Sequence, residues 1–562
     1  MKGTREERMD ELDSAYPVWE KQTIWARFLS CALRFPQTEF IVFDDGSRYT
    51  YEEVRCCANR IAAALNQLGV QQGDCIVLKM EPSLEMVSLI FSLAKIGAVK
   101  VLVNRNVGPF EFTYIANKVR ASYVFLDDER VLASSADCPT VRRTIVKVSN
   151  DSAQAGLLPD KVLPWGEFIA QTLSNDSVIT VEDPDLLSDI MFTSGSTGNP
   201  KGVPLTHDML QRSAFANCMN RGFERNRRIG CLVPLYHCFG YVEGLLAALF
   251  VGATLLIPKR KFEPRKTLRW LRDERANDIL CVIYMMLRSC AYLKGNPMSF
   301  PALHAMYCAG ELAPDTLWAD IMDCFGISDV IDGYGMTEIC GAMAQTRPGD
   351  SCEILKRKVG VVLPAGSAGS KAYGGHLVEY RVVDRDSGES LPDGDVGELY
   401  CRGLTVMEGY CREEQANEES FSEDGWLKTG DLGSIDADGY IELFGRVRET
   451  YRINGENVSP TFLEQIINRC NAVRRSVVVG VPDRDYGAVG ALFVQLTDGA
   501  NLDEVKQFCR ESLARFQVPK YYFCMDEGDW PRTASGKIQR FKLEERAQQE
   551  TKSKICAQEG RV

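Results

Sequence analysis

Ten consecutive residues concentrate groups that bind phosphate. Positions 193–202 read TSGSTGNPKG, a run of glycines and hydroxyl side chains that includes Lys201. Glycine permits positive φ angles and lets backbone N–H groups approach a ligand closely. Successive N–H groups form an anion-binding concavity, to which Lys201 adds a fixed positive charge. The run follows an apolar strand and precedes a helix expected near Thr206, so it predicts a loop that binds a polyphosphate.

The spacing of this loop differs from that of a Walker-A loop. The pattern GxxxxGK[ST] is absent, because Lys201 is preceded by Pro200 and followed by Gly202. Ordinary nucleotide hydrolysis on a Walker-A scaffold is therefore disfavoured. The alternative is a surface loop rich in small residues, but such loops seldom concentrate these groups so strongly.

The loop matches completely the TSG[ST]TGxPKG signature of the adenylate-forming enzymes. Four further matches follow in that family's order, at 334–338 (YGMTE), 429–431 (TGD), 445–449 (GRVRE) and 531–540 (PRTASGKIQR). The chain thus resembles a superfamily that includes acyl-CoA synthetases, luciferases and peptide-synthetase adenylation domains, and it resembles the fatty-acyl-CoA synthetases most. The resemblance runs from about residue 20 to 545.

The resemblance implies catalytic roles for Lys537, Thr337, Glu338 and His237. Lys537 is expected to bridge the substrate carboxylate and the α-phosphate of ATP, and Thr337 to contact that phosphate. Glu338 is expected to hold Mg²⁺, a hard cation that prefers oxygen ligands. The residues expected to bind ATP or AMP are Thr193, Ser194, Gly195, Ser196, Thr197, Gly198, Lys201, Gly310, Glu311, Asp332, Gly333, Tyr334, Gly335, Met336, Thr337, Asp431, Arg446 and Lys537.

Each of these motifs alone has a purely structural alternative. YGMTE could be the end of a strand and the start of a helix, and TGD a β-turn. GRVRE could be a solvated charged turn, and Lys537 an ordinary solvent-facing lysine. The succession of five motifs in family order favours the functional interpretation. Asp431 is then expected to accept the ribose hydroxyls, as acidic residues do in dinucleotide sites.

A further motif at 234–240, PLYHCFG, resembles the PL[FY]HxxG of fatty-acyl and aryl-CoA synthetases. It places His237 near the acyl carboxylate, where amino-acid-activating relatives have an aspartate for the substrate ammonium. An amino acid substrate is therefore not expected, although a core histidine is the structural alternative. The expected acyl pocket is mostly small or apolar and comprises Tyr236, His237, Tyr241, Cys308, Ala309, Cys340 and Gly341. We expect a medium- or long-chain fatty acid first, and an aromatic or steroid-like ring acid second.

The thiol acceptor is expected to be CoA. Positions 455–460 (GENVSP) resemble the segment that borders the pantetheine channel in relatives, which implicates Gly455 and Glu456. Glu449 occupies the hinge position, where relatives more often carry aspartate. Arg452 stands where relatives often have lysine. In relatives the small C-terminal domain rotates about the hinge between adenylation and thioester formation.

The elements that must position these residues alternate between short apolar strands and amphipathic helices, which is typical of βαβ units around a parallel sheet. A helix is expected over 50–68, with Thr50 and Glu53 forming a capping box and Gly69 ending it. Strands are expected at 75–79, 99–104, 122–126, 144–148, 189–193, 229–233, 254–257 and 280–283. From about residue 376, short alternating segments separated by DG and SG turns predict antiparallel strands.

The sequence therefore predicts an α/β fold with two domains. A large N-terminal domain, 1–445, is expected to hold parallel βα layers and a small antiparallel, barrel-like subdomain from about 376. A small, mobile α+β domain, 446–562, is expected to carry Lys537, with the boundary near residues 446–449.

Bulk composition limits the partners. The 562 residues carry a formal net charge of −12, so the surface should repel nucleic acid and anionic lipid unless a basic patch is hidden in it. No nucleic acid partner is expected. No window of eighteen apolar residues predicts a spanning helix, although peripheral membrane contact stays open. Twenty scattered cysteines and a charged N-terminus without an apolar core favour the cytoplasm. The oligomeric state stays open.

Three alternatives remain at this stage. The acyl group could pass to the phosphopantetheine arm of a carrier protein instead of CoA. A non-catalytic acyl-nucleotide sensor would be expected to lack Lys537 or Glu338, and both are present. A luciferase-type oxygenase is not separated from a ligase by these motifs.

Overall fold

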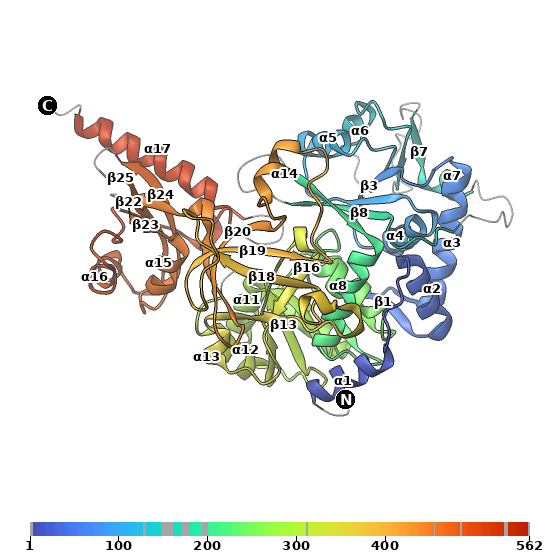
Figure 1. The fold of residues 1–562 in the computed structure, drawn as a ribbon, viewed down its shortest axis with the longest axis horizontal. Coiled ribbons are helices and arrows are strands. Elements are labelled where there is room, and N and C mark those ends of the chain that lie inside the picture. The colour runs from blue at the N-terminus through green and yellow to red at the C-terminus, as the bar shows by residue number, and fades with distance from the viewer. Residues whose placement is uncertain are drawn as a thin grey trace.

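The structure is a computed structural model that describes residues 4–127, 131–147, 161–170, 180–193, 200–310, 313–453, 456–483, 486–532 and 538–559. Figure 1 shows the N-terminal part of the chain as layered sheets and helices, with the C-terminal elements gathered at the opposite end of the molecule. The predicted α/β fold class is confirmed.

Two sheets of mainly parallel strands form the N-terminal part. The first has the order β7-β6-β5-β3-β4-β8-β9 and is parallel except for the β8–β9 pair. Its strands are β3 (Cys75–Lys79), β4 (Val99–Leu102), β5 (Tyr123–Leu126), β6 (Arg143–Val146), β7 (Val162–Pro164), β8 (Leu187–Thr193) and β9 (Lys201–Thr206).

The second sheet has the order β14-β13-β12-β10-β11-β1-β2 and is parallel except for the β1–β2 pair. Its strands are β1 (Glu39–Phe43), β2 (Arg48–Thr50), β10 (Arg228–Cys231), β11 (Thr254–Ile257), β12 (Asp278–Val282), β13 (Ala305–Ala309) and β14 (Asp329–Ile331). The predicted strands in these two sheets match those observed to within a few residues at their ends.

Helices cover both faces of these sheets. Side chains of α2 (Ile24–Arg34), α3 (Tyr51–Gln67), α4 (Leu84–Ile96) and α8 (His207–Asn220) share one hydrophobic core with the inner faces of both sheets. Alternation along a strand separates the layers, because Ile76 and Leu78 of β3 join this central core while Val77 joins an outer one.

The outer cores take side chains from α5 (Pro109–Lys118), α6 (Leu132–Ala136), α10 (Pro264–Asp273), α11 (Ile283–Gly295) and α12 (Leu317–Phe325). The central core also takes side chains from α1 (Arg5–Ala15), α7 (Trp165–Ala170), α9 (Cys238–Gly240) and a π-helix at Tyr241–Leu246. The capping box predicted for α3 is present. Thr50 Oγ1 accepts from Glu53 N–H, and Gly69 follows the helix with φ 84°.

A third, antiparallel sheet has the order β15-β16-β17-β21-β20-β19-β18. Its strands are β15 (Gly333–Met336), β16 (Gly341–Gln345), β17 (Lys358–Val362), β18 (Val378–Val383), β19 (Gly397–Gly403), β20 (Leu427–Ile435) and β21 (Ile441–Arg446). The expected start of this β-rich part near residue 376 is therefore wrong, because three strands precede it. These early strands are short and glycine-rich, so they lack the alternation that marked the later ones.

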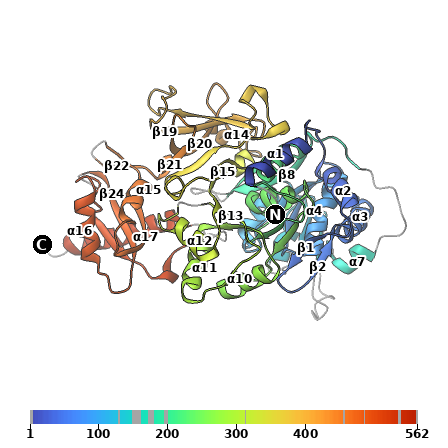
Figure 2. The same ribbon diagram turned by 90° about the horizontal axis from the view of Figure 1, so that it is seen from below.

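Short helices accompany the antiparallel sheet. They are α13 (Cys352–Leu355), α14 (Glu414–Ser420) and 3-10 turns at Thr337–Ile339, Gly366–Ala368 and Lys371–Tyr373. Figure 2 shows this sheet beside the parallel layers, with β21 directed toward the C-terminal elements.

The chain leaves the third sheet through a 3-10 turn, Val447–Glu449, and enters a five-stranded sheet. The strands are β22 (Tyr451–Ile453), β23 (Glu456–Val458), β24 (Val473–Asp483), β25 (Gly487–Leu496) and β26 (Tyr521–Cys524). The helices are α15 (Pro460–Ile467), α16 (Leu502–Ser512) and α17 (Arg540–Glu559), with a 3-10 turn at Glu527–Asp529. A domain boundary at residues 446–449, and any motion about it, remain predictions.

In the described part of the chain, no helix is long and apolar enough to cross a membrane. The cysteines described there are free thiols.

Candidate active site

The phosphate loop begins and ends on a pair of antiparallel strands. Thr193 ends β8, Lys201 begins β9, and the two are paired across the ladder. The expected nucleotide-binding residues Ser194, Gly195, Ser196, Thr197 and Gly198 lie outside the described residues. The strand β9 separates the loop from α8, whose N-cap is Thr206 as expected. The structure therefore fixes the two ends of the predicted loop.

Lys201 and Glu338 both contact the side chain of Tyr410. The ammonium of Lys201 lies 4.7 Å from the centre of the Tyr410 ring, a cation–π distance. The hydroxyl of Tyr410 donates to Glu338 Oε1 at 2.8 Å. Backbone hydrogen bonds from Met407 N–H to Glu338 O and from Cys411 N–H to Gly202 O tie the same loop to both motifs. The Tyr410 loop thus brings the phosphate loop and YGMTE together.

Glu338 is a buried carboxylate. It follows Thr337 in the 3-10 turn after β15, and 7% of its surface is exposed. Burial raises the pKa of the Glu338 carboxyl, and the hydroxyl of Tyr410 opposes that rise. A buried carboxylate that accepts a hydrogen bond from a neutral hydroxyl is a group that a cation would stabilise further.

Asp431 contacts two other expected site residues, Tyr334 and Arg446. Its Oδ2 accepts from the hydroxyl of Tyr334 at 2.7 Å, and its Oδ1 lies 2.8 Å from Arg446 Nε. Asp431 and Arg446 are direct partners across β20 and β21, so the sheet register enforces their pairing. Asp431 raises the pKa of the Arg446 guanidinium. TGD lies within a strand and is not the β-turn of the structural alternative.

Two glycines in the same region have no room for a side chain. A Cβ on Gly335 would overlap the carbonyl oxygen of Gly341 on β16, and one on Gly333 would overlap the hydroxyl of Tyr307. The glycines thus let β15 lie close against its neighbours. Asp332, just before β15, is buried and accepts from Gly333 N–H at 2.7 Å, and burial raises the pKa of its carboxyl well above the usual range.

His237 caps the short helix α9. Its Nδ1 accepts from the backbone N–H of Phe239 at 3.2 Å. Assigned from this hydrogen bond, the proton of a neutral imidazole lies on Nε2, which can donate to a ligand. A Cβ on Gly240 would come within 2.5 Å of the Pro234 carbonyl oxygen, so the chain must reverse tightly here and needs glycine.

The expected acyl-pocket residues divide between two cores. Tyr241, Ala309 and Cys340 belong to the central hydrophobic core, and half-buried Tyr236 packs against it. Gly341 follows Cys340 at the start of β16, both with positive φ. Cys308 does not join them, because it lies on the other face of β13 and packs into the outer core around α11 and α12. The sequence analysis predicted neither the strand that carries Cys308 nor the face on which this residue lies.

A buried ion pair lies beneath this region. Lys100 Nζ lies 3.1 Å from Asp189 Oδ2, and neither side chain is exposed. The hydroxyl of Tyr241 lies 3.4 Å from the same oxygen. Asp189 is on β8, four residues before Thr193, and Tyr241 is on the π-helix that follows His237. The Tyr241–Asp189 contact therefore connects this π-helix to the strand that leads into the phosphate loop.

The C-terminal motif ends on an arginine that reaches the expected hinge. Arg540 Nε lies 3.2 Å from Glu449 Oε2, and Arg540 Nη2 lies 2.5 Å from Glu464 Oε2. A Cβ on Gly445 would meet Thr461 Oγ1 at 2.6 Å, so the glycine allows α15 to lie against β21. The expected residues Glu311, Gly455 and Lys537 lie outside the described residues, and Glu456 begins β23.

Comparison with known proteins decides the family. The family model described as AMP-binding enzyme matches residues 28–411, and the model of the AMP-binding enzyme C-terminal domain matches residues 463–537. The chain belongs to the AMP-binding enzyme family. The predicted resemblance is thereby confirmed.

Individual relatives of this AMP-binding enzyme are distant but cover it almost completely. The medium-chain acyl-CoA ligase ACSF2, mitochondrial, of Danio rerio is 30% identical over 566 residues, which cover 96% of this chain and 90% of the relative. The solved structure of ATP-bound MatB from Rhodopseudomonas palustris has a TM-score of 0.80 at 25% identity and covers 92% of this chain and 98% of its own. MenE from Bacillus subtilis is an o-succinylbenzoate CoA synthetase whose structure was solved with ATP and magnesium ion. Its TM-score is 0.78 at 25% sequence identity, and the match covers 93% of this chain and 99% of MenE.

Two groups in this AMP-binding enzyme escaped the sequence analysis. Tyr410 is 72 residues from Glu338 in the chain, and no local pattern indicated it. Glu243 was detectable, because it is a lone acid in an apolar run. Its Oε1 accepts from Ala342 N–H at 2.9 Å, and burial raises the pKa of its carboxyl to about 7.

Proposed function

We propose that this AMP-binding enzyme is an ATP-dependent carboxylic acid:CoA ligase. The observation that carries the proposal is the convergence of distant motifs: the Tyr334–Asp431 hydrogen bond joins residues 97 apart, and the Glu338–Tyr410 hydrogen bond joins residues 72 apart. Polar groups from YGMTE, TGD and GRVRE are brought into direct contact in this way.

The reaction solves a leaving-group problem. A carboxylate is a poor acyl donor, because oxide would have to leave. Attack by the acid's oxygen on the α-phosphorus of ATP releases pyrophosphate and gives an acyl-adenylate. A CoA thiolate then attacks the acyl carbon, and AMP leaves with the bridging oxygen. Negative charge accumulates in both steps on phosphate or carbonyl oxygens, so positioning and electrostatics dominate catalysis.

The residues take the following roles in this proposal. Asp431 accepts the ribose hydroxyls, and Tyr334 and Arg446 hold its carboxylate in place. Lys201 and the loop hydroxyls bind the phosphates, Thr337 contacts the α-phosphate, and Lys537 bridges it to the acid. His237, with its proton on Nε2, donates toward the acid's carboxylate.

Glu338 is the residue that would hold Mg²⁺, together with phosphate oxygens and water. Bound there, the ion would neutralise charge on the phosphates. Tyr410 fixes the orientation of the Glu338 carboxylate.

We propose a medium- or long-chain fatty acid as the substrate. The proposed pocket residues Tyr236, Tyr241, Ala309 and Cys340 lie in or against the central hydrophobic core, which favours an apolar tail. The Danio rerio relative is named a medium-chain acyl-CoA ligase. A ring acid is the second candidate, since MenE is named an o-succinylbenzoate CoA synthetase.

We also propose the cytoplasm as the site of action, because the described cysteines are free thiols, as in reducing compartments. The word mitochondrial in the name of the Danio rerio relative makes cell fractionation of the tagged protein the necessary check.

The test is a panel of saturated fatty acids of increasing length, benzoic and cinnamic acids and a bile acid, each with ATP and Mg²⁺, with and without CoA. Pyrophosphate release confined to fatty acids, with CoA consumed, supports the proposal. Release confined to ring acids assigns the second substrate class, and release without CoA consumption points to a carrier protein. Light emission or oxygen uptake with any acid would indicate a luciferase-type reaction.

A further inference from the structure

The surface around helix α10 has the opposite charge to the rest of the protein. Between residues 259 and 275 there are eight lysines and arginines and three acids, in a chain with a net charge of −12. Seven of the eight are exposed and form what we call the α10 basic face: Arg260, Lys261, Arg265, Lys266, Arg269, Arg272 and Arg275. No long basic run marks this face in the sequence, because apolar residues interrupt it.

The helix itself separates the two kinds of residue. Pro264, Thr267, Leu268 and Leu271 are buried, and Leu268 and Leu271 belong to the outer core of the second sheet. Arg265, Arg269 and Arg272 recur at intervals of four and three residues and therefore share the outward side. Packing of the buried side against the outer core holds α10 in place, and the basic side faces the solvent.

Local acids neutralise only a small part of this face. Glu263 pairs with Lys266 at 2.6 Å and Asp273 with Arg272 at 2.7 Å. The third acid, Glu274, pairs instead with Arg48 and Arg228 behind the face. Within the described part of the chain, no ion pair involves Arg260, Lys261, Arg265, Arg269 or Arg275. Five positive charges are thus left for a partner.

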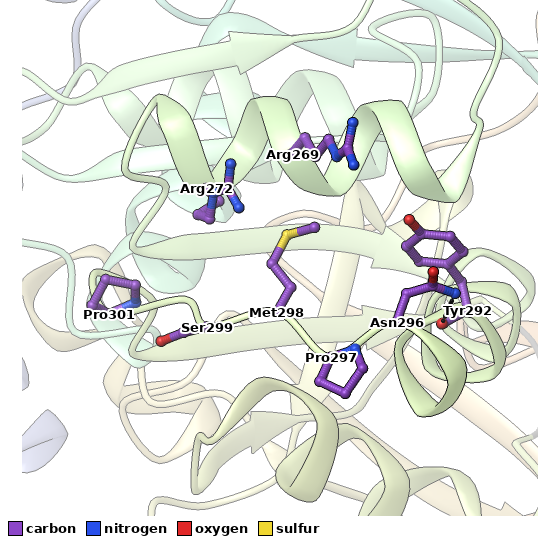
Figure 3. Close-up of a pocket in the computed structure, with 8 residues that line it drawn as sticks. All are labelled: Arg269, Arg272, Tyr292, Asn296, Pro297, Met298, Ser299 and Pro301. Atoms are coloured by element: carbon purple, nitrogen blue, oxygen red, sulfur yellow. Dashed lines mark hydrogen bonds between the residues drawn. The ribbon is translucent and has the colours of Figure 1, made fainter.

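A groove of about 650 Å³ adjoins the face. Figure 3 shows Arg269 and Arg272 of α10 on one side of it and Tyr292, Asn296, Pro297 and Met298 on the other. No acid is among its lining residues. Half-buried Trp270, Tyr292 and Met298 leave part of their apolar surface beside the arginines. On the far side of the 297–299 segment lie Asp320 and Asp323, which limit the positive region there.

We propose that the α10 basic face and its groove dock the protein on an anionic phospholipid bilayer. Charge complementarity selects an anionic surface, since each Lys or Arg near such a bilayer strengthens binding by about fivefold. The aromatic and thioether side chains among the arginines favour a bilayer over a nucleic acid, because such groups reside at headgroup depth. The negative charge of the remaining surface orients the protein so that only this face approaches.

The test is co-sedimentation of the full chain with large unilamellar vesicles, without substrates. Vesicles of phosphatidylglycerol and phosphatidylcholine in a 1:1 ratio are compared with vesicles of phosphatidylcholine alone. The protein should bind only the anionic vesicles, and binding should weaken as salt is raised. Because no substrate is present, this result is independent of the proposed ligase activity.

The decisive variant combines Arg260→Gln, Lys261→Gln, Arg265→Gln and Arg269→Gln, and its partition coefficient should fall at least about 100-fold. A matched control changes four exposed basic residues elsewhere, Lys371, Arg385, Arg510 and Arg515, to Gln and should bind like the original chain. An unchanged melting temperature shows that each variant folds. Failure to bind anionic vesicles, or equal losses in both variants, overturns the proposal. Face-dependent binding of DNA without vesicle binding would overturn it too and assign the face to nucleic acid.

Discussion

The hydroxyl of Tyr334 donates a 2.7 Å hydrogen bond to Asp431, whose other carboxylate oxygen pairs with Arg446. One carboxylate thus links three motifs. Replacing Asp431 by Ala should raise the KM for ATP about 10- to 100-fold, because hydrogen bonds to a charged group contribute about 1.5–3 kcal/mol. The change in kcat should be smaller.

Steady-state kinetics with ATP as the varied substrate checks this prediction, and Tyr334→Phe should give a milder increase, since the carboxylate survives. Asp395→Ala, at an exposed position on the turn before β19, is the control. A KM for ATP unchanged in Asp431→Ala would remove Asp431 from the nucleotide site.

The carboxyl of Glu338 should make activity depend on Mg²⁺ and pH together. Burial raises its pKa, so it is more readily protonated than an exposed carboxyl, and only the ionised form binds a cation well. The Mg²⁺ concentration for half-maximal pyrophosphate release should therefore rise as pH falls. In Glu338→Gln it should be about 10- to 100-fold higher and should depend less on pH. Equal Mg²⁺ requirements in both proteins would refute this role.

Glu243 should make the protein less stable as pH rises. Burial raises the pKa of its carboxyl from 4.5 to about 7, so the folded state holds the proton more tightly than the unfolded state. The stability due to the protonated form is complete below pH 4.5 and is lost as pH rises to about 7. Glu243→Gln keeps an acceptor for Ala342 N–H and should be the more stable protein at pH 8 by about 3 kcal/mol.

Urea denaturation at pH 4.5 and pH 8 measures the Glu243 effect. The two proteins should have similar unfolding free energies at the lower pH and diverge at the higher one. A constant difference across this range would show that the carboxyl of Glu243 titrates normally.

Removing only one partner of the buried Lys100–Asp189 pair should lower the free energy of unfolding far more than removing both. Lys100→Met leaves a buried, uncompensated Asp189 and should cost about 3–5 kcal/mol. The double variant Lys100→Met/Asp189→Asn should regain most of that loss, since no buried charge remains. Chemical denaturation of both variants tests this, and additive losses would contradict it.

Much of the fold was predictable from local pattern. Thr50 and Glu53 formed the capping box expected from their spacing, and the eight strands predicted for the two parallel sheets lie where hydrophobicity indicated. Two further apolar strands of the second sheet, Glu39–Phe43 and Ala305–Ala309, were not predicted. The strand from Lys201 to Thr206 and those from Gly333 to Val362 were missed, because they are short, polar or glycine-rich and owe their conformation to pairing with neighbours.

The sequence motifs of the site were predictable, but the contacts between residues far apart in the chain were not. The sequence indicated Glu338, Asp431 and Arg446, yet Tyr410 contacts Glu338 across 72 residues and has no local signature. The orientation of Cys308 toward the outer core depends on strand register, which the short apolar run around it does not specify. The α10 basic face was readable in principle, since its arginines follow helical periodicity.

Lys537 provides the most direct test of the central claim that an acyl-adenylate precedes the thioester. The measurement is the amount of pyrophosphate and acyl-CoA formed from ATP, Mg²⁺, CoA and the best acid of the panel, by the original chain and by Lys537→Ala, with exposed Lys542→Ala as the control. We expect equal amounts of the two products from the original chain and the control. We expect at least about a 100-fold loss of both in Lys537→Ala, which should still convert supplied acyl-adenylate and CoA to acyl-CoA. Full pyrophosphate release by Lys537→Ala, or acyl-CoA formed with ADP and phosphate in place of AMP and pyrophosphate, would contradict the adenylate route.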